Sequence, residues 1–111
     1  MSNRSLNHDT LQNQIILALN NTKICRVWSQ PTGAAYREEK LIRYGLIGCA
    51  DITGLMIDGR RLEVEVKTGK AVQSEQQKCF EQMILSKGGI YFVARSVADA
   101  LLSLEHNRHL K

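Results

Sequence analysis

The strongest constraint on the fold is a short run in which apolar and charged residues alternate, LEVEVK at residues 62–67. In a β-strand, every second side chain lies on the same face. The apolar members would therefore enter a core, while Glu63, Glu65 and Lys67 would project together from the opposite face. Such alternation is also typical of a strand whose polar face is simply solvated. The neighbouring strand is needed to distinguish the two interpretations.

A second strand is predicted for Ala50–Ile57, and Asp58-Gly59 is a strong signal for a hairpin turn between the two strands. A two-residue loop would place Asp51 opposite Val66. A three-residue loop, with Gly59 in the left-handed conformation, would place Asp51 opposite Glu65. Only the three-residue loop keeps apolar residues together on the core face, because a shift of one residue moves every side chain to the other face. We therefore expect Asp51 beside Glu65.

Two directly opposed carboxylates destabilise a sheet unless a positive charge neutralises them. A divalent cation would do so, and carboxylate oxygens suit Mg²⁺. Lys67 would lie beside that ion, where it could orient an attacking water or stabilise charge on a phosphate. Asp51, Glu65 and Lys67 on one face thus indicate a site that cleaves phosphodiester bonds.

The remaining pattern predicts an α/β fold with one mixed sheet flanked by helices, in the order α-β-β-β-α-β-α. The segment Ala34–Gly48 is ambiguous and could be a short helix or an ordered loop. We expect a single domain over residues 1–111. The other predicted elements are a helix from about Asp9 to Asn21, a strand at Ile24–Ser29, a helix from Ser74 to Lys87, a strand at Ile90–Ala94 buried on both faces, and a last helix from Ser96 with Val97, Leu101 and Leu104 facing inward.

Several of these pieces together resemble the virus-type replication-repair nuclease (VRR-NUC) family of the PD-(D/E)xK nuclease superfamily. The matching pieces are Gly48-x-x-Asp51, Glu65-Val66-Lys67, residues 74–80 and the Gly88-Gly89 turn. The resemblance implies a restriction-endonuclease-like fold, dependence on Mg²⁺ or Mn²⁺ and no small-molecule cofactor. It also implies cleavage of structured DNA. We further expect a homodimer that cuts a branched form such as a four-way junction, in the cytoplasm of a bacterial or virus-infected cell.

The resemblance also assigns roles to individual residues. Asp51 and Glu65 match the metal-binding acids, and Lys67 matches the catalytic lysine. The backbone carbonyl of Val66 is an expected further ligand, and Gln77 matches a glutamine that supports the site. Where the family usually has glutamate in its first helix, the nearest acid here is Asp9.

Two of these residues have an equally simple structural explanation. Ser74-x-x-Gln77 is a capping box, in which Gln77 folds back on the backbone N–H of Ser74, and this role is compatible with a role in the site. Asp9 with Gln12 could likewise form the N-cap of the first helix, which we favour over a ligand role.

The net charge of +4 agrees with a polyanionic partner such as DNA. Only 5% of the residues are aromatic, so such contacts cannot rest mainly on stacking. Five basic residues are candidates for phosphate contacts, or else belong to a solvated surface: Arg37, Lys40, Arg43, Arg60 and Arg61. The histidines at 8, 106 and 109 lie in polar terminal segments and are expected to be solvated.

No apolar run is long enough to cross a membrane, and the polar N-terminus has no signal peptide. The three cysteines are widely spaced, which disfavours a zinc site and agrees with a reducing cytosol. Two alternatives to a DNA endonuclease remain. One is a catalytically silent DNA-binding module of the same fold, and the other is a structural protein in which the charged residues of the strand are solvated.

Overall fold

A computed structural model describes residues 3–31, 33–37, 40–44 and 47–109, with the side chains of residues 7–31 and 47–109. Its helices and strands follow in the order α1 (Asn3–Asn21), β1 (Cys25–Ser29), β2 (Gly33–Arg37), β3 (Lys40–Tyr44), β4 (Ile52–Met56), β5 (Arg61–Val66), α2 (Glu75–Ser86), β6 (Ile90–Ala94) and α3 (Val97–Arg108). Strands β1, β4, β5 and β6 form one sheet, whereas β2 and β3 form a separate hairpin.

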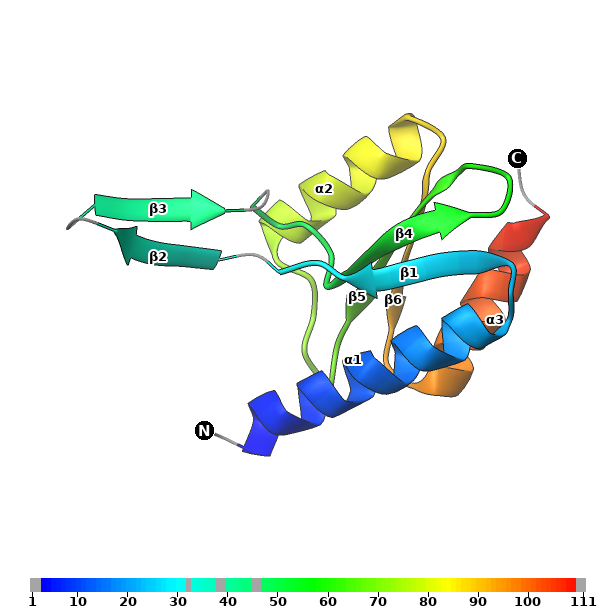
Figure 1. Ribbon diagram of the computed structural model, residues 1–111, viewed down its shortest axis with the longest axis horizontal. Helices are drawn as coiled ribbons and strands as arrows, with labels where there is room; N and C mark the ends of the chain where they lie inside the picture. Colours follow the sequence, from blue (N-terminus) through cyan, green and yellow to red (C-terminus); the bar gives the residue numbers. More distant parts are fainter. Residues whose placement is uncertain (1–2, 32, 38–39, 45–46, 110–111) are drawn as a thin grey trace.

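The main sheet is mixed and is flanked by helices on both faces (Figure 1). Its strand order is β1-β4-β5-β6; β5 and β6 run parallel, and the other neighbours are antiparallel. Helices α1 and α3 cover one face and α2 lies on the other (Figure 1). The predicted fold class is confirmed at this level, and the order α-β-β-β-α-β-α holds for the main sheet and its three helices.

The register between β4 and β5 is the one that the apolar pattern predicts. Ile52 pairs with Val64 and Gly54 pairs with Leu62. At the turn, the backbone N–H of Met56 donates to the carbonyl of Arg60, and Gly59 has a φ of 93°. The turn is therefore the three-residue loop with a left-handed glycine, which leaves Asp51 and Glu65 on the same side of the sheet.

The main core lies between the sheet and the pair α1 and α3. Apolar side chains from all four strands of the sheet meet Ile15 and Leu19 of α1 and Leu104 of α3 there. The strand β6 is buried on both faces, as predicted, because Phe80 and Ile84 of α2 pack with its Tyr91 on the second face. The prediction that Leu101 faces inward is wrong, since this side chain is 36% exposed and the fully buried Ala100 contributes to the core instead.

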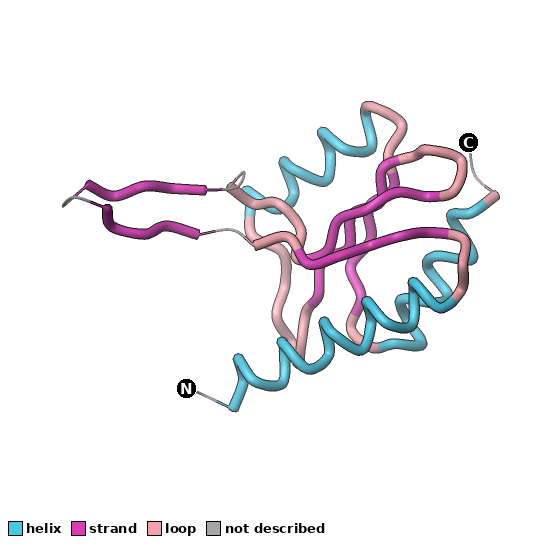
Figure 2. Tube along the Cα trace, in the orientation of Figure 1, coloured by secondary structure: helices cyan, strands magenta, loops and turns pink. Residues whose placement is uncertain are grey.

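The segment that could be a short helix or an ordered loop is instead the β2–β3 hairpin. Gly33 pairs with Tyr44, and Arg37 pairs with Lys40 near its tip. The hairpin extends away from the main sheet (Figure 2). It is an insertion between β1 and β4, which are neighbours in the sheet.

The first helix begins earlier than predicted. Helix α1 starts at Asn3 and Asp9 lies within it, so the prediction that Asp9 is its N-cap is wrong. Within the described residues, no helix combines the length and the hydrophobicity that a membrane crossing requires.

Candidate active site

The predicted site residues lie where β4 begins and β5 ends. The N-terminal ends of α1 and α2 lie at this end of the sheet, and the hairpin projects from it (Figure 1). Asp51 directly precedes β4, Glu65 and Val66 end β5, and Gln77 lies in the first turn of α2. Segments that are distant in the sequence thus converge on one end of the fold.

Asp51 is held by its neighbours on both sides. Its carbonyl accepts a hydrogen bond of 2.8 Å from the backbone N–H of Gln30. Its carboxylate oxygen Oδ2 accepts another of 2.8 Å from the backbone N–H of Val66. The side chain is therefore fixed against the end of β5, beside Glu65, as the register predicts.

Glu65 is an almost fully buried carboxyl, with 2% of the residue exposed. Burial raises its pKa to about 9, and the hydrogen bond and negative charge of Asp51 act in the same direction, opposed by the charge of Lys67. Its Oε2 atom is buried and has no hydrogen-bond partner among the residues that the structure describes. In this arrangement Glu65 holds a proton at neutral pH, and its Oε2 atom is open to a further ligand.

Lys67 and Gln77 are joined, and the two explanations for Gln77 hold together. The Nζ atom of Lys67 donates to Oε1 of Gln77 at 2.9 Å. The same oxygen accepts from the backbone N–H of Ser74 at 2.9 Å, and Ser74 Oγ accepts from the N–H of Gln77 at 3.1 Å. The capping box of α2 therefore fixes the amide that positions the lysine.

His8 also belongs to this site, although its place in a polar terminal segment predicted a solvated side chain. Its Nε2 atom lies 3.0 Å from the carbonyl oxygen of Val66 and 3.4 Å from Oδ2 of Asp51. On the other side of the ring, Nδ1 lies 3.6 Å from Oδ1 of Asp9. Asp9 itself is 71% exposed and thus lies at the rim of the site.

A sequence signal for His8 existed. Leu11, Ile15 and Leu19 form the stripe of α1 that packs on the sheet. Extending this stripe toward the N-terminus by three residues from Leu11 reaches His8, at the spacing of one helical turn. The prediction that the helix starts at Asp9 hid this relationship.

These side chains line an open pocket of about 470 Å³. Its chemistry is mixed, because its lining includes three carboxyls, an imidazole, a primary amine and an amide. The lining residues are His8, Asp9, Asp51, Glu65, Val66, Lys67, Thr68, Ala71 and Gln77.

Glu63 does not take part in this pocket and is not solvated. It is fully buried, and its Oε1 accepts from Thr53 Oγ1 at 3.0 Å and from Arg61 Nε at 2.6 Å. Burial raises the pKa of Glu63, while the hydrogen bonds from Arg61 and Thr53 and the charge of Arg61 lower it. Arg61 therefore pairs with a buried acid. A phosphate contact by Arg61 would compete with this ion pair, so the predicted contact is less favourable.

Arg60 has a structural role, and its DNA contact stays a prediction. Its guanidinium donates to the carbonyls of Asn107 and Arg108 at 2.9 Å and to Asp58 at 2.8 Å. It thereby caps the C-terminal end of α3. Backbone placement puts Arg37, Lys40 and Arg43 in the hairpin, but their side chains lie outside the described part of the structure.

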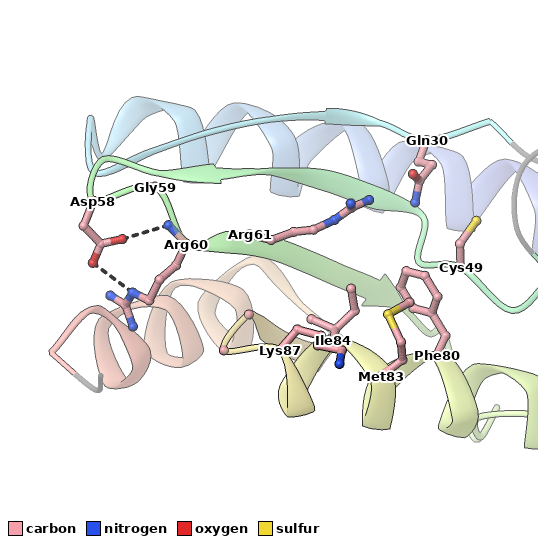
Figure 3. A pocket seen from close by; sticks show the side chains of 12 residues that line it. Gln30, Cys49, Asp58, Gly59, Arg60, Arg61, Phe80, Met83, Ile84 and Lys87 are labelled. Carbon is pink, nitrogen blue, oxygen red and sulfur yellow. Dashed lines mark hydrogen bonds and ion pairs between the residues drawn. The ribbon is translucent and has the colours of Figure 1, made fainter.

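A larger pocket of about 690 Å³ lies between α2 and the strands β4 and β5 (Figure 3). Phe80, Met83 and Ile84 give it an apolar wall. Its carboxylate, Asp58, forms an ion pair with Arg60 at 2.8 Å. The pocket contains neither Asp51 nor Glu65, so the polar pocket is the better candidate for chemistry.

The donor atoms that line the polar pocket suit a divalent cation. Among the described residues, no group of three or more His, Cys, Asp or Glu side chains could hold a metal by itself. The adjacent carboxyls of Asp51 and Glu65 and the carbonyl of Val66 nevertheless provide hard oxygen donors, and the buried Oε2 of Glu65 has no hydrogen-bond partner in the described ranges. No protein-family model and no curated protein matches the chain.

Proposed function

We propose that this protein is a metal-dependent DNA endonuclease with a restriction-endonuclease-like fold, related to the VRR-NUC family. One observation carries the proposal. The carboxyls of Asp51 and Glu65 lie against each other at the end of the sheet, in the same pocket as Lys67. Burying two acids together is costly for folding unless a cation or a shared proton offsets their repulsion. Such a cost is expected where the acids serve a function.

Each residue of the pocket has a definite part in this proposal. Asp51, Glu65 and the Val66 carbonyl would hold Mg²⁺ or Mn²⁺, and Gln77 keeps Lys67 directed into the pocket. When bound, the cation supplies positive charge at the scissile phosphate and makes a water molecule more acidic. Lys67 can orient that water or stabilise the charge that develops on the phosphate.

Structured DNA is the substrate that we propose, with branched DNA such as a four-way junction as the preferred form. The projecting hairpin supports this choice, since it carries Arg37, Lys40 and Arg43 and leaves the main sheet at the end where β4 begins (Figure 1). Basic side chains on such an arm could follow the phosphate backbone over a distance that the small main sheet cannot reach. A homodimer would present two such sites to the two strands of a junction.

The proposal is tested by cleavage of labelled four-way junctions and linear duplexes with Mg²⁺, Mn²⁺ or EDTA. Glu65→Gln and Lys67→Ala should abolish cleavage while leaving the fold and DNA binding largely intact, since neither side chain packs in the main core. Glu75→Gln and Lys87→Ala are matched controls on exposed positions of α2 and its C-cap. Cleavage by either site variant near the wild-type rate would reject the site. Tight DNA binding without cleavage by the wild-type protein would instead favour the silent DNA-binding module.

The assembly is tested separately. Light scattering at micromolar concentration should give the mass of a dimer, and a junction labelled on each strand in turn should show paired cuts. A monomer that cuts single-strand flaps but ignores junctions would overturn the dimer and the junction preference, while the nuclease assignment would stand.

A further inference from the structure

The arrangement of His8 resembles that of a metal ligand more than that of a surface histidine. Its Nε2 atom faces two acceptor groups, the Val66 carbonyl oxygen at 3.0 Å and Asp51 Oδ2 at 3.4 Å. Both acceptors belong to the set that the proposed function assigns to the cation. A carbonyl oxygen can only accept, so Nε2 carries a proton in this arrangement and directs it between the two oxygens.

The distances from Nε2 to the two oxygens are compatible with a cation bound between them. Adjacent ligands of an octahedral ion with bonds of about 2.1 Å lie about 3.0 Å apart. The two distances from Nε2 are close to this value. As they lie, these side chains do not yet form a group of three metal ligands among the described residues, so a cation could take the place of the Nε2 proton only if the side chains move. Glu65 Oε2, which has no hydrogen-bond partner in the described part of the chain, lines the same pocket as a further donor.

The other ring nitrogen has the environment that ligating histidines usually have. A histidine that binds a metal through one nitrogen generally directs the other toward a carboxylate or carbonyl, which fixes the ring and its tautomer. Here Asp9 Oδ1 lies 3.6 Å from Nδ1. The imidazole of His8 thus has Asp9 near one ring nitrogen and Asp51 near the other, and it lines the pocket.

We propose that His8 is a ligand, through Nε2, of the divalent cation held by Asp51, Glu65 and the Val66 carbonyl, and that it makes the site favour transition-metal ions over Mg²⁺. This inference rests on the proposed function for the existence of the cation. An all-oxygen site suits Mg²⁺, whereas imidazole nitrogen is a better ligand for transition metals. Asp9 would act as a positioning residue for the imidazole and not as a ligand.

Metal binding without DNA tests the inference directly. Mn²⁺ is the probe, and its binding to the wild-type protein, His8→Ala and His8→Gln is measured by electron paramagnetic resonance titration. Spin-echo modulation of bound Mn²⁺ then detects a directly coordinated nitrogen. His106→Ala is the matched control, because His106 is exposed on α3, away from the pocket. Thermal melting in EDTA shows whether each variant folds.

We expect both His8 variants to bind Mn²⁺ at least about tenfold more weakly than the wild type, and to lose the nitrogen modulation. Mg²⁺ affinity, from competition with Mn²⁺, should fall less, so the preference for Mn²⁺ should shrink. Gln retains an N–H for the Val66 carbonyl, so wild-type behaviour of His8→Gln together with weakened binding in His8→Ala would show a hydrogen-bonding role and overturn the inference.

A further variant distinguishes a failure of the His8 assignment from a failure of the proposed function. Asp51→Asn should lose Mn²⁺ binding in any case. If it does, and the wild type shows no nitrogen modulation, the inference on His8 is wrong and the proposed function survives. If the wild-type protein binds no Mn²⁺ at millimolar concentration, both the inference on His8 and the proposed function are wrong.

Discussion

The Nζ atom of Lys67 lies 2.9 Å from Oε1 of Gln77, and that same oxygen closes the capping box of α2 with Ser74. Two substitutions distinguish the role of Gln77 in capping α2 from its role in positioning Lys67. Ser74→Ala removes the cap hydroxyl at a cost of about 1 kcal/mol in unfolding free energy. Gln77→Leu removes the cap amide and also the partner of the lysine.

We therefore expect Ser74→Ala to cleave DNA near the wild-type rate and Gln77→Leu to lose activity by up to about 100-fold. Single-turnover cleavage, together with urea unfolding of both variants, checks this. Equal loss of activity in the two variants would mean that Gln77 serves only the helix and does not position Lys67.

Glu65 should make the metal-free protein less stable as the pH rises. The folded state holds the carboxyl proton up to a pKa of about 9, against an ordinary value of 4.5. The stabilisation is thus complete below pH 4.5 and is lost as the pH approaches 9, by up to about 1.4 kcal/mol per pH unit. Glu65→Gln stays neutral and should lack this slope. Urea unfolding in EDTA at pH 6, 7.5 and 9 compares the two proteins, and parallel pH profiles would contradict the raised pKa.

The hairpin should carry a large part of the salt dependence of DNA binding. Replacing Arg37, Lys40 and Arg43 by alanine should lower the slope of log affinity against log salt by about one unit for each phosphate that the variant no longer neutralises. Fluorescence anisotropy with a labelled junction over a salt series measures the slope.

The control for the hairpin variant removes the same charge elsewhere. Arg26, Lys87 and Arg108 are exposed positions on β1, at the C-cap of α2 and at the end of α3. Their triple alanine variant should keep most of the slope. A slope that changes equally in both variants would indicate an effect of net charge alone, without phosphate binding by the hairpin.

Gly48 should be required for placing Asp51. It has a φ of 82°, and a Cβ atom there would lie 2.4 Å from the carbonyl oxygen of Gln76 in α2. Gly88 has a nearly equal φ of 85° with open space around it, so Gly88→Ala measures the cost of the left-handed backbone alone, about 1 kcal/mol. Gly48→Ala adds steric overlap with the backbone of α2, which costs about 1–3 kcal/mol more.

Cleavage activity should be retained in Gly88→Ala, the less destabilised variant, and reduced in Gly48→Ala. Thermal melting of the two variants provides the comparison of stability. If Gly48→Ala matches Gly88→Ala in both measurements, the close approach of this segment to α2 has no part in forming the site.

Local pattern is sufficient to predict the sheet and much of the site. The apolar alternation of β5 and the position of Gly59 determine the register, and the register brings Asp51 to Glu65. The capping box is readable because Ser74 and Gln77 are close in the sequence. These features depend on spacing within one or two elements.

Features that depend on distant contacts are not predictable in this way. Alternation cannot tell whether the second face of a strand is covered, so it suggests a solvated Glu63 although this residue is fully buried. The polar start of α1 carries no apolar stripe before His8, so the pattern does not reveal that the helix begins at Asn3. Nor does the hairpin segment show the regular alternation by which a strand with one buried face is recognised.

The insertion of the hairpin between β1 and β4 has a consequence for how such a protein can diversify. Ser29 and Ile52 pair in the sheet at its base, and Gln30 bonds to Asp51 across the same junction. The two ends of the insertion are therefore joined by the sheet itself. Evolution can lengthen, shorten or exchange the hairpin tip without moving Glu65 or Lys67, so under the proposed function substrate preference and chemistry could change independently of each other.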